Sequence, residues 1–189
     1  MRAWPHQLIA ALWLVFAAYW LIASRSVKPV RERQSVASRS AHLLALLAIA
    51  LLLGIRHWPL PLGAQVIPGG WTRYWCAVAL VLVGLGFSVW ARVALGTNWS
   101  GLVTVKVGHE LVRHGPYRRI RHPIYSGILL AILGTALAAG QVHGLIALAL
   151  ALVALWLKSR VEERWMQQEF GAQYAAYRAS SWALIPFVL

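Results

Sequence analysis

The sequence contains no aspartate and a single cysteine, and these absences exclude several classes of protein. Its five acidic residues are all glutamates, and with 18 lysines and arginines they give a formal net charge of +13. Cys76 alone supports neither an internal disulfide framework nor a multi-cysteine metal site. No His-x-x-His pair occurs among the seven histidines, so the usual zinc ligand sets are also missing. We therefore expect no bound metal.

Phosphate-binding signatures are missing too, whereas apolar side chains are abundant. There is no Walker loop and no Gly-x-Gly-x-x-Gly run, which argues against the standard nucleotide-binding folds. Hydrophobic residues make up 60% of the chain, in blocks too long for a small soluble core. The basic residues cluster between these blocks, a pattern typical of membrane proteins, so we expect membrane lipids rather than nucleic acid as partners.

Five apolar blocks predict the architecture, at residues 8–23, 41–55, 75–95, 124–139 and 142–157. A membrane span needs about 20 apolar residues, and only the third block meets this without help from flanking interfacial side chains. A four-span arrangement with one re-entrant block is the alternative. We expect an all-α, polytopic membrane bundle of about five spans. It would form one domain over residues 1–189, with three spans in 1–95 and the functional half in 96–189.

The distribution of lysine and arginine predicts the orientation of the bundle. Five of these residues lie between the first and second blocks, and five more lie between the third and fourth. By the positive-inside rule, the N-terminus is outside and the C-terminus is in the cytoplasm. The polar segment 160–179 follows the last block and carries spaced aromatic residues, which predicts a cytoplasmic amphipathic helix.

The first candidate site is the basic stretch HGPYRRIRHPIYSG at residues 114–127. Pro123 is suited to the first position of a helix, which would place Arg121 and His122 just outside a helix N-terminus that favours anions. A simpler interpretation is that the arginines bind lipid headgroups and set the topology, as Arg118 and Arg119 would do. Topology alone explains neither the histidine nor the tyrosine of the stretch.

The second candidate site is KSRVEE at residues 158–163. Helical spacing predicts the pairs Lys158–Glu162 and Arg160–Glu163. These pairs would stabilise the protein little if they were only surface salt bridges. Both charged segments leave the membrane on the same side and at the same depth, so we expect them to form one pocket.

The segments LGTNWSG, GHELVRHGPYRRIRHPIYSG, RVEERWMQQEFGAQYAAYRA and IPF resemble the isoprenylcysteine carboxyl methyltransferase family, over about residues 95–187. That family belongs to a wider group that includes phospholipid N-methyltransferases. The resemblance implies S-adenosylmethionine in a cytoplasmic pocket capped by the C-terminal segment, with Glu162 or Glu163 taking its ammonium group. The expected cofactor-binding residues are His109, Glu110, Leu111, Val112, Tyr117, Arg121, His122, Pro123, Tyr125, Glu162 and Glu163.

In the eukaryotic branch of this family, an arginine four residues before the contacting glutamate holds the substrate carboxylate. Lys158 stands at that position if Glu162 is the match, and Arg160 follows two residues later. These two residues are the expected catalytic pair. Lysine offers a point charge rather than the two-pronged contact of arginine.

Three functions remain open from the sequence. The first is methylation of the carboxylate of a prenylated or similar lipophilic acid that enters from the bilayer. The second is N-methylation of an aminophospholipid, which needs a base such as His109, His114 or His122. The third is a non-enzymatic protein that binds anionic lipids through its basic loops.

Overall fold

Each of the five predicted apolar blocks corresponds to an α-helix. The computed structural model describes residues 4–25, 36–55, 57–96 and 111–188. In these ranges the α-helices are α1 (Trp4–Ala23), α2 (Val36–Gly54), α3 (Trp71–Leu95), α4 (Pro123–Ala139) and α5 (Val142–Ala179), and a short 3-10 helix, η2 (Gly115–Arg118), precedes α4. The same ranges contain isolated β-bridges but no strand, so the expected all-α fold is confirmed.

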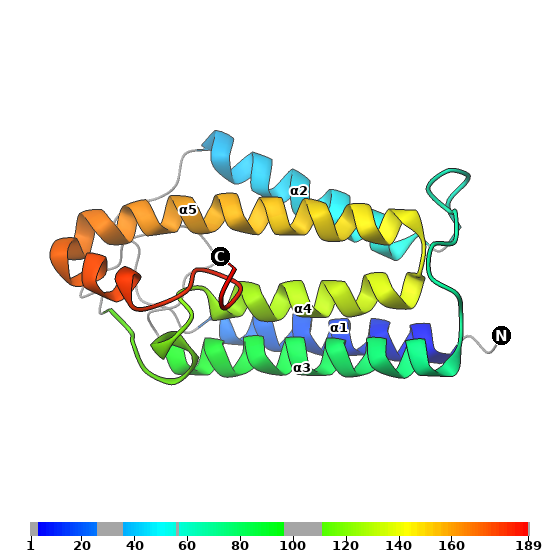
Figure 1. Cartoon of the computed structure of the whole chain (residues 1–189), viewed down its shortest axis with the longest axis horizontal. Coiled ribbons are helices and arrows are strands. Elements are labelled where there is room, and N and C mark those ends of the chain that lie inside the picture. Colours follow the sequence, from blue (N-terminus) through cyan, green and yellow to red (C-terminus); the bar gives the residue numbers. More distant parts are fainter. Residues whose placement is uncertain (1–3, 26–35, 56, 97–110, 189) are drawn as a thin grey trace.

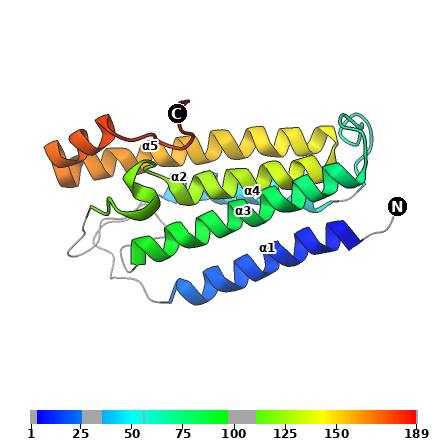
Figure 2. The same cartoon turned by 60° about the horizontal axis from the view of Figure 1, so that its bottom comes forward.

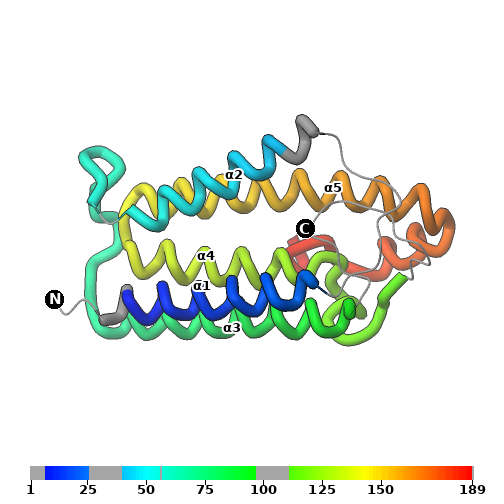
Figure 3. The backbone as a smooth tube through the Cα atoms, turned by 180° about the vertical axis from the view of Figure 1, so that it is seen from behind, coloured from blue at the N-terminus to red at the C-terminus, as the bar shows by residue number. Residues whose placement is uncertain are grey.

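Successive α-helices run in opposite directions along one long axis (Figure 1). Helix α3 packs between α1 and α4, and α5 packs against α4 and α2. Figure 2 shows α1 on the outer side of α3, and Figure 3 shows α2 lying along α5. One end of the bundle therefore gathers η2, the start of α4 and the C-terminal part of α5, which carry both charged segments.

The helices differ in how well they suit a membrane. Within the described residues, α3 and α5 are long and apolar enough to cross one, whereas Gln7–Ala23, Ser40–Gly54 and Pro123–Ala139 are shorter apolar stretches. Helix α4 begins at Pro123, as predicted. Helix α5 does not end with its apolar block at residue 157 but continues through the charged segment to Ala179, with a break at Gly171 (φ 49°).

The closest packing in the bundle is between α3 and α4, because small residues face each other there. A Cβ atom added at Gly84 would lie 2.5 Å from the carbonyl oxygen of Gly127. The hydroxyl of Ser88 donates to the carbonyl oxygen of Ile124 at 3.0 Å. Small side chains allow helix backbones to approach closely in membrane proteins. This contact fixes the start of α4, and with it the candidate site.

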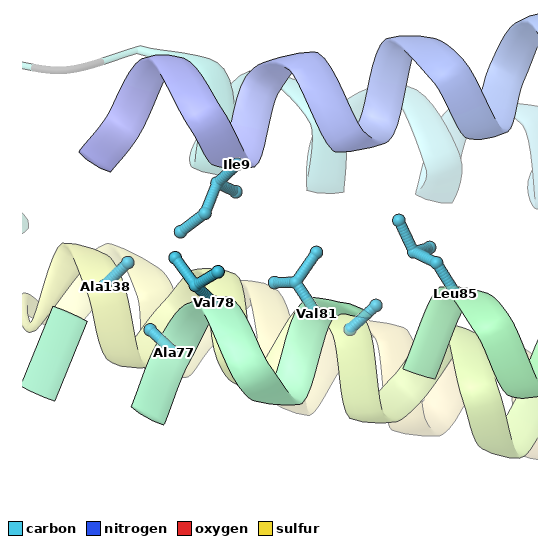
Figure 4. Packing of buried hydrophobic residues seen from close by; sticks show 7 residues of the cluster. Ile9, Ala77, Val78, Val81, Leu85 and Ala138 are labelled. Atoms are coloured by element: carbon cyan, nitrogen blue, oxygen red, sulfur yellow. The ribbon is translucent and has the colours of Figure 1, made fainter. Parts of the chain in front are cut away.

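Helix α1 attaches to this pair through apolar and polar contacts. Figure 4 shows Ile9 pointing toward Val78 and Val81 of α3. The indole Nε1 of Trp13 donates to the hydroxyl of Thr135 on α4 at 3.0 Å. At the site end, the buried Arg92 donates to the carbonyl oxygens of Ala23 (2.7 Å) and Gly96 (2.8 Å). Carbonyl groups at helix ends need such donors, so Arg92 fixes the end of α1 against α3.

The α3–α4 contact predicts different responses to alanine at two glycines of one helix. Gly84→Ala must push α4 away, which costs about 1–3 kcal/mol and lowers Tm in detergent. Gly86→Ala is the matched control, because a Cβ atom there meets nothing within 4 Å. It carries the same change in helix propensity. Equal Tm values for the two variants would contradict the described packing.

Candidate functional site

The candidate site forms where the basic loop before α4 meets the end of the chain. Residues 181–184, called here the C-terminal strap, run alongside residues 119–122 in a parallel bridge between Ile120 and Trp182. The backbone N–H groups of Arg121 and His122 donate to the carbonyl oxygens of Trp182 (2.8 Å) and Ala183 (3.0 Å). Leu184 anchors the strap, since its side chain is fully buried.

The local sequence explains the shape of this loop. Gly115 adopts a left-handed conformation (φ 57°), which glycine accepts without strain, and Pro116 follows in η2. The buried Tyr117 packs near Ile124, and its carbonyl oxygen accepts a hydrogen bond from the hydroxyl of Tyr177. Pro123 then starts α4 with His122 at the N-cap. Arg121 and His122 are thereby held just before the N-terminus of α4, as predicted from the sequence.

Five side chains from the two charged segments form one cluster, in which three side chains of the first segment contact Glu162 and Glu163 of the second. The Nε atom of Arg121 lies 2.7 Å from Oε1 of Glu163, with both side chains less than one-tenth exposed. The ring of His122 lies between the carboxylates, with Nδ1 3.4 Å from Glu162 and Nε2 3.5 Å from Glu163. The hydroxyl of Tyr125 donates to Glu162 at 2.6 Å. The charged segments 114–127 and 158–163 therefore meet, as predicted from their shared depth in the membrane.

The predicted pairing within α5 is wrong for Glu163. Its ion-pair partners are Arg121 and, at 3.7 Å, Arg178, whereas Arg160 is exposed and its guanidinium lies 5.9 Å from the centre of the Trp156 ring. Helical spacing permits the Arg160–Glu163 pair. Because Glu163 is buried, it pairs instead with Arg121, which also holds the loop before α4 against α5. Glu163 is thus a buried group that joins three segments, and the simpler interpretation as a surface salt bridge does not apply to it.

Lys158 lies beside the cluster, in contrast to Arg160. Its Nζ atom is 5.3 Å from the centre of the Tyr125 ring and 3.5 Å from Nε2 of His42 on α2. The ring of Tyr125 also stacks on His122, with 5.6 Å between ring centres. Of the expected catalytic pair, the structure therefore brings only Lys158 to the carboxylates.

The other residues singled out from the sequence differ in their burial. Tyr117 and Pro123 are buried, and Leu111 and Val112 are half-buried. Arg118 and Arg119 are exposed, so they are accessible to headgroups. His109 and Glu110 lie outside the described residues. In the part of the chain that the structure describes, no group of three or more His, Cys, Asp or Glu side chains could hold a metal ion.

Sequence reasoning missed several residues that complete the cluster. Arg178 approaches Glu163, and its carbonyl oxygen accepts a hydrogen bond from Nη1 of Arg121 at 3.2 Å. Ser126 donates to the carbonyl oxygen of Leu184 and so ties α4 to the strap. His42 reaches Lys158 from α2. These contacts join residues far apart in the chain, and no local spacing signals them.

The electrostatics of the cluster favour a charged imidazole. Burial disfavours the cationic form of His122, but hydrogen bonding and the negative charges of Glu162 and Glu163 outweigh this and raise its pKa. The site therefore combines two cations, Arg121 and His122, with two carboxylates. Glu162 is the more accessible carboxylate, 21% exposed against 5% for Glu163. The site thus presents charges of both signs, and Glu162 is the carboxylate that is more accessible to a cation.

Comparisons with known proteins identify the family of the chain. The family model described as phospholipid methyltransferase matches residues 72–173. Protein-S-isoprenylcysteine O-methyltransferase A of Arabidopsis thaliana is 29% identical over 150 residues, covering 75% of this chain and 74% of that protein. Protein YpbQ of Bacillus subtilis is 29% identical over 127 residues, covering 67% and 74%.

A solved structure shares the fold. The eukaryotic intramembrane Ras methyltransferase, an isoprenylcysteine carboxyl methyltransferase, superposes with a TM-score of 0.56 at 22% identity, over 79% of this chain and 53% of that one. The family model and the named relatives define a membrane methyltransferase. The chain belongs to the phospholipid methyltransferase family, and its sequence resemblance to the isoprenylcysteine carboxyl methyltransferases is confirmed.

The Arg121–Glu163 ion pair predicts a large loss of stability on removal of one charge. Glu163→Gln leaves Arg121 buried without its counter-charge and loosens the strap, which costs about 3 kcal/mol. The matched control is Glu169→Gln, an exposed glutamate on the same helix. Tm in detergent without any ligand measures both. A loss of stability no larger for Glu163→Gln than for Glu169→Gln would contradict the role of the pair.

The raised pKa of His122 predicts how its contribution to stability depends on pH. A raised folded-state pKa stabilises the fold fully below the ordinary histidine pKa of about 6.5, and this gain is lost as pH rises through the folded-state value. The Tm difference between wild type and His122→Asn should therefore shrink as the pH rises above about 6.5. The exposed His57→Asn serves as control. A Tm difference for His122→Asn that stays constant with pH would refute a charged His122.

Proposed function

We propose that this membrane methyltransferase uses S-adenosylmethionine to methylate the carboxylate of a lipophilic, isoprenylcysteine-like acid. The observation that carries the proposal is the junction of Glu162 and Glu163 with His122 and Tyr125, beside the ammonium group of Lys158. It offers negative charge for a cationic donor and positive charge for an anionic acceptor within one cluster. The substrate named for the Arabidopsis relative is a prenylated cysteine, which fits this arrangement.

The residues present fit the amino-acid part of S-adenosylmethionine. Glu162, the more accessible carboxylate, would hold the ammonium group. Among the described residues, the buried Nε2 of His122 makes no hydrogen bond of ordinary geometry, although Glu163 lies 3.5 Å away. It is therefore suited to donate to the ligand carboxylate. When bound, the cofactor supplies a reactive methyl group on a sulfonium sulfur.

The acceptor side of the proposal rests on Lys158. A carboxylate is already ionised at neutral pH and needs no general base, so the protein has to supply binding and orientation. Lys158 gives the acceptor carboxylate a cation within reach of Tyr125, and exposed apolar side chains on the helices allow a lipid tail to stay in the bilayer. Arg160 lies away from the carboxylates, so we assign the acceptor contact to Lys158.

N-methylation of an aminophospholipid is the competing chemistry, since the family model carries the name phospholipid methyltransferase. It would need a base to remove a proton from the amine. His122 is held between two carboxylates that favour its protonated form, and His114 is exposed. The described cluster therefore supports the carboxyl reaction better.

The proposal includes an orientation in the membrane. The charged end of the bundle would face the cytoplasm, with the N-terminus outside, because the described basic residues of the loop before α4 and of the later part of α5 meet at that end. All five helices would span the bilayer as one domain. The polar part of α5 beyond residue 157 would then lie at the cytoplasmic interface, with Trp165 and Phe170 among its half-buried aromatic residues.

The proposal predicts the chemical form of the transferred methyl group. Membranes containing the protein are incubated with methyl-labelled S-adenosylmethionine, a prenylcysteine analogue and a total lipid extract, and the lipid-soluble label is treated with alkali. We expect the label to be released as methanol, as a methyl ester requires. Label that survives alkali in an amine headgroup would refute carboxyl methylation and favour the aminophospholipid.

Binding of labelled S-adenosylmethionine to the same membranes tests the donor site. Glu162→Gln removes the charge that pairs with the ammonium group, so donor binding should weaken by about tenfold to a hundredfold. Glu169→Gln, remote from the cluster, is the matched control. Donor binding by Glu162→Gln that equals that of the control would contradict this site.

A further inference from the structure

Helix α2 brings one polar side chain to the cluster. His42 is half-buried near the start of α2, and its Nε2 lies 3.5 Å from Nζ of Lys158. Farther along the same helix interface, Ile49 is buried in one apolar cluster with Ala151 and Leu155 of α5. The position of His42 is therefore fixed by the packing of α2 on α5. His42 lies outside residues 72–173, the region that matches the family model.

The chemistry of the two groups determines which one donates. An ammonium group has three N–H donors and no acceptor, so Nε2 of His42 must accept from Lys158. The imidazole is then neutral, with its proton on Nδ1. A neutral partner orients the ammonium group and leaves its charge intact, whereas a carboxylate partner would cancel that charge.

Contacts with His42 and Tyr125 thus help to restrict the flexible side chain of Lys158. His42 holds its end from one side, and the ring of Tyr125 lies 5.3 Å from Nζ on another. Tyr125 in turn donates to Glu162 at 2.6 Å. A chain of contacts therefore runs from α2 to the carboxylate assigned to the donor. A lysine side chain carries about 2 kcal/mol of rotamer entropy, so its placement depends on such contacts.

We propose that His42 is a positioning residue that sets the Lys158 ammonium group for the anionic head group of the acceptor. This inference rests on the proposed function. It assigns α2 a part in selecting an acid over a neutral compound of the same shape. His42 touches neither donor nor reacting atoms, and it acts through Lys158.

The test compares three substitutions at His42. His42→Leu and His42→Ala remove the hydrogen-bond acceptor, whereas His42→Gln keeps one in its side-chain carbonyl. We expect the first two to raise KM for the prenylcysteine analogue by about tenfold, because a hydrogen bond to a charged group is lost. The kcat value and the KM for S-adenosylmethionine should stay within about twofold, and His42→Gln should restore the acceptor KM. The matched control is His57→Leu, a substitution of an exposed histidine at the other end of the bundle.

A neutral inhibitor separates positioning from a general structural effect. The carboxamide of the same prenylcysteine analogue lacks the negative charge, so its inhibition constant should not change in His42→Leu or His42→Ala. An equal rise in acid KM and amide inhibition constant would overturn the inference, as would an unchanged acid KM in both variants. Failure of the proposed function looks different, because wild-type protein would then form no alkali-labile methyl ester.

Discussion

The buried ion pair between Arg121 and Glu163 is the interaction on which the arrangement of the site depends. It joins the loop before α4 to α5, and Arg121 also donates to the carbonyl oxygens of Arg178 and Ser181 at the end of the chain. Burying two charges is expensive unless their remaining hydrogen-bonding groups are satisfied. Here one guanidinium bridges three segments, so desolvation of the pair is offset by contacts that also fix the C-terminal strap.

The charged groups of α5 near this pair differ in their burial and in their contacts. Glu163 holds the fold together, while Glu162 is more exposed and is held by Tyr125 and His122. Adjacent residues on a helix point about 100° apart, which explains why two neighbouring glutamates reach different partners. Lys158, one turn before Glu162, lies between His42 of α2 and the ring of Tyr125. A short run of sequence thereby supplies one buried structural carboxylate and, in the proposed function, the contacts for donor and acceptor.

The sequence predicted some features of the site and left others undetermined, for physical reasons. Apolar blocks and the proline at position 123 predicted the helices and the start of α4, because these signals are local. The contact between the two charged segments was also predictable, because both leave the membrane on the same side and at the same depth. The partner of Glu163 did not, since helical spacing favours Arg160 and only burial selects Arg121. His42 lies 116 residues from Lys158, so their contact depends on packing alone.

In the proposed function, the loop before α4 and the charged part of α5 form one donor site. The most direct measurement is hydrogen–deuterium exchange in detergent or nanodiscs, with and without S-adenosylhomocysteine, the product form of the donor. We expect S-adenosylhomocysteine to slow exchange both in residues 117–126 and in residues 158–184. Exchange in residues 57–70, at the opposite end of the bundle, should stay unchanged. Protection confined to one segment, or protection at the opposite end, would contradict a shared site.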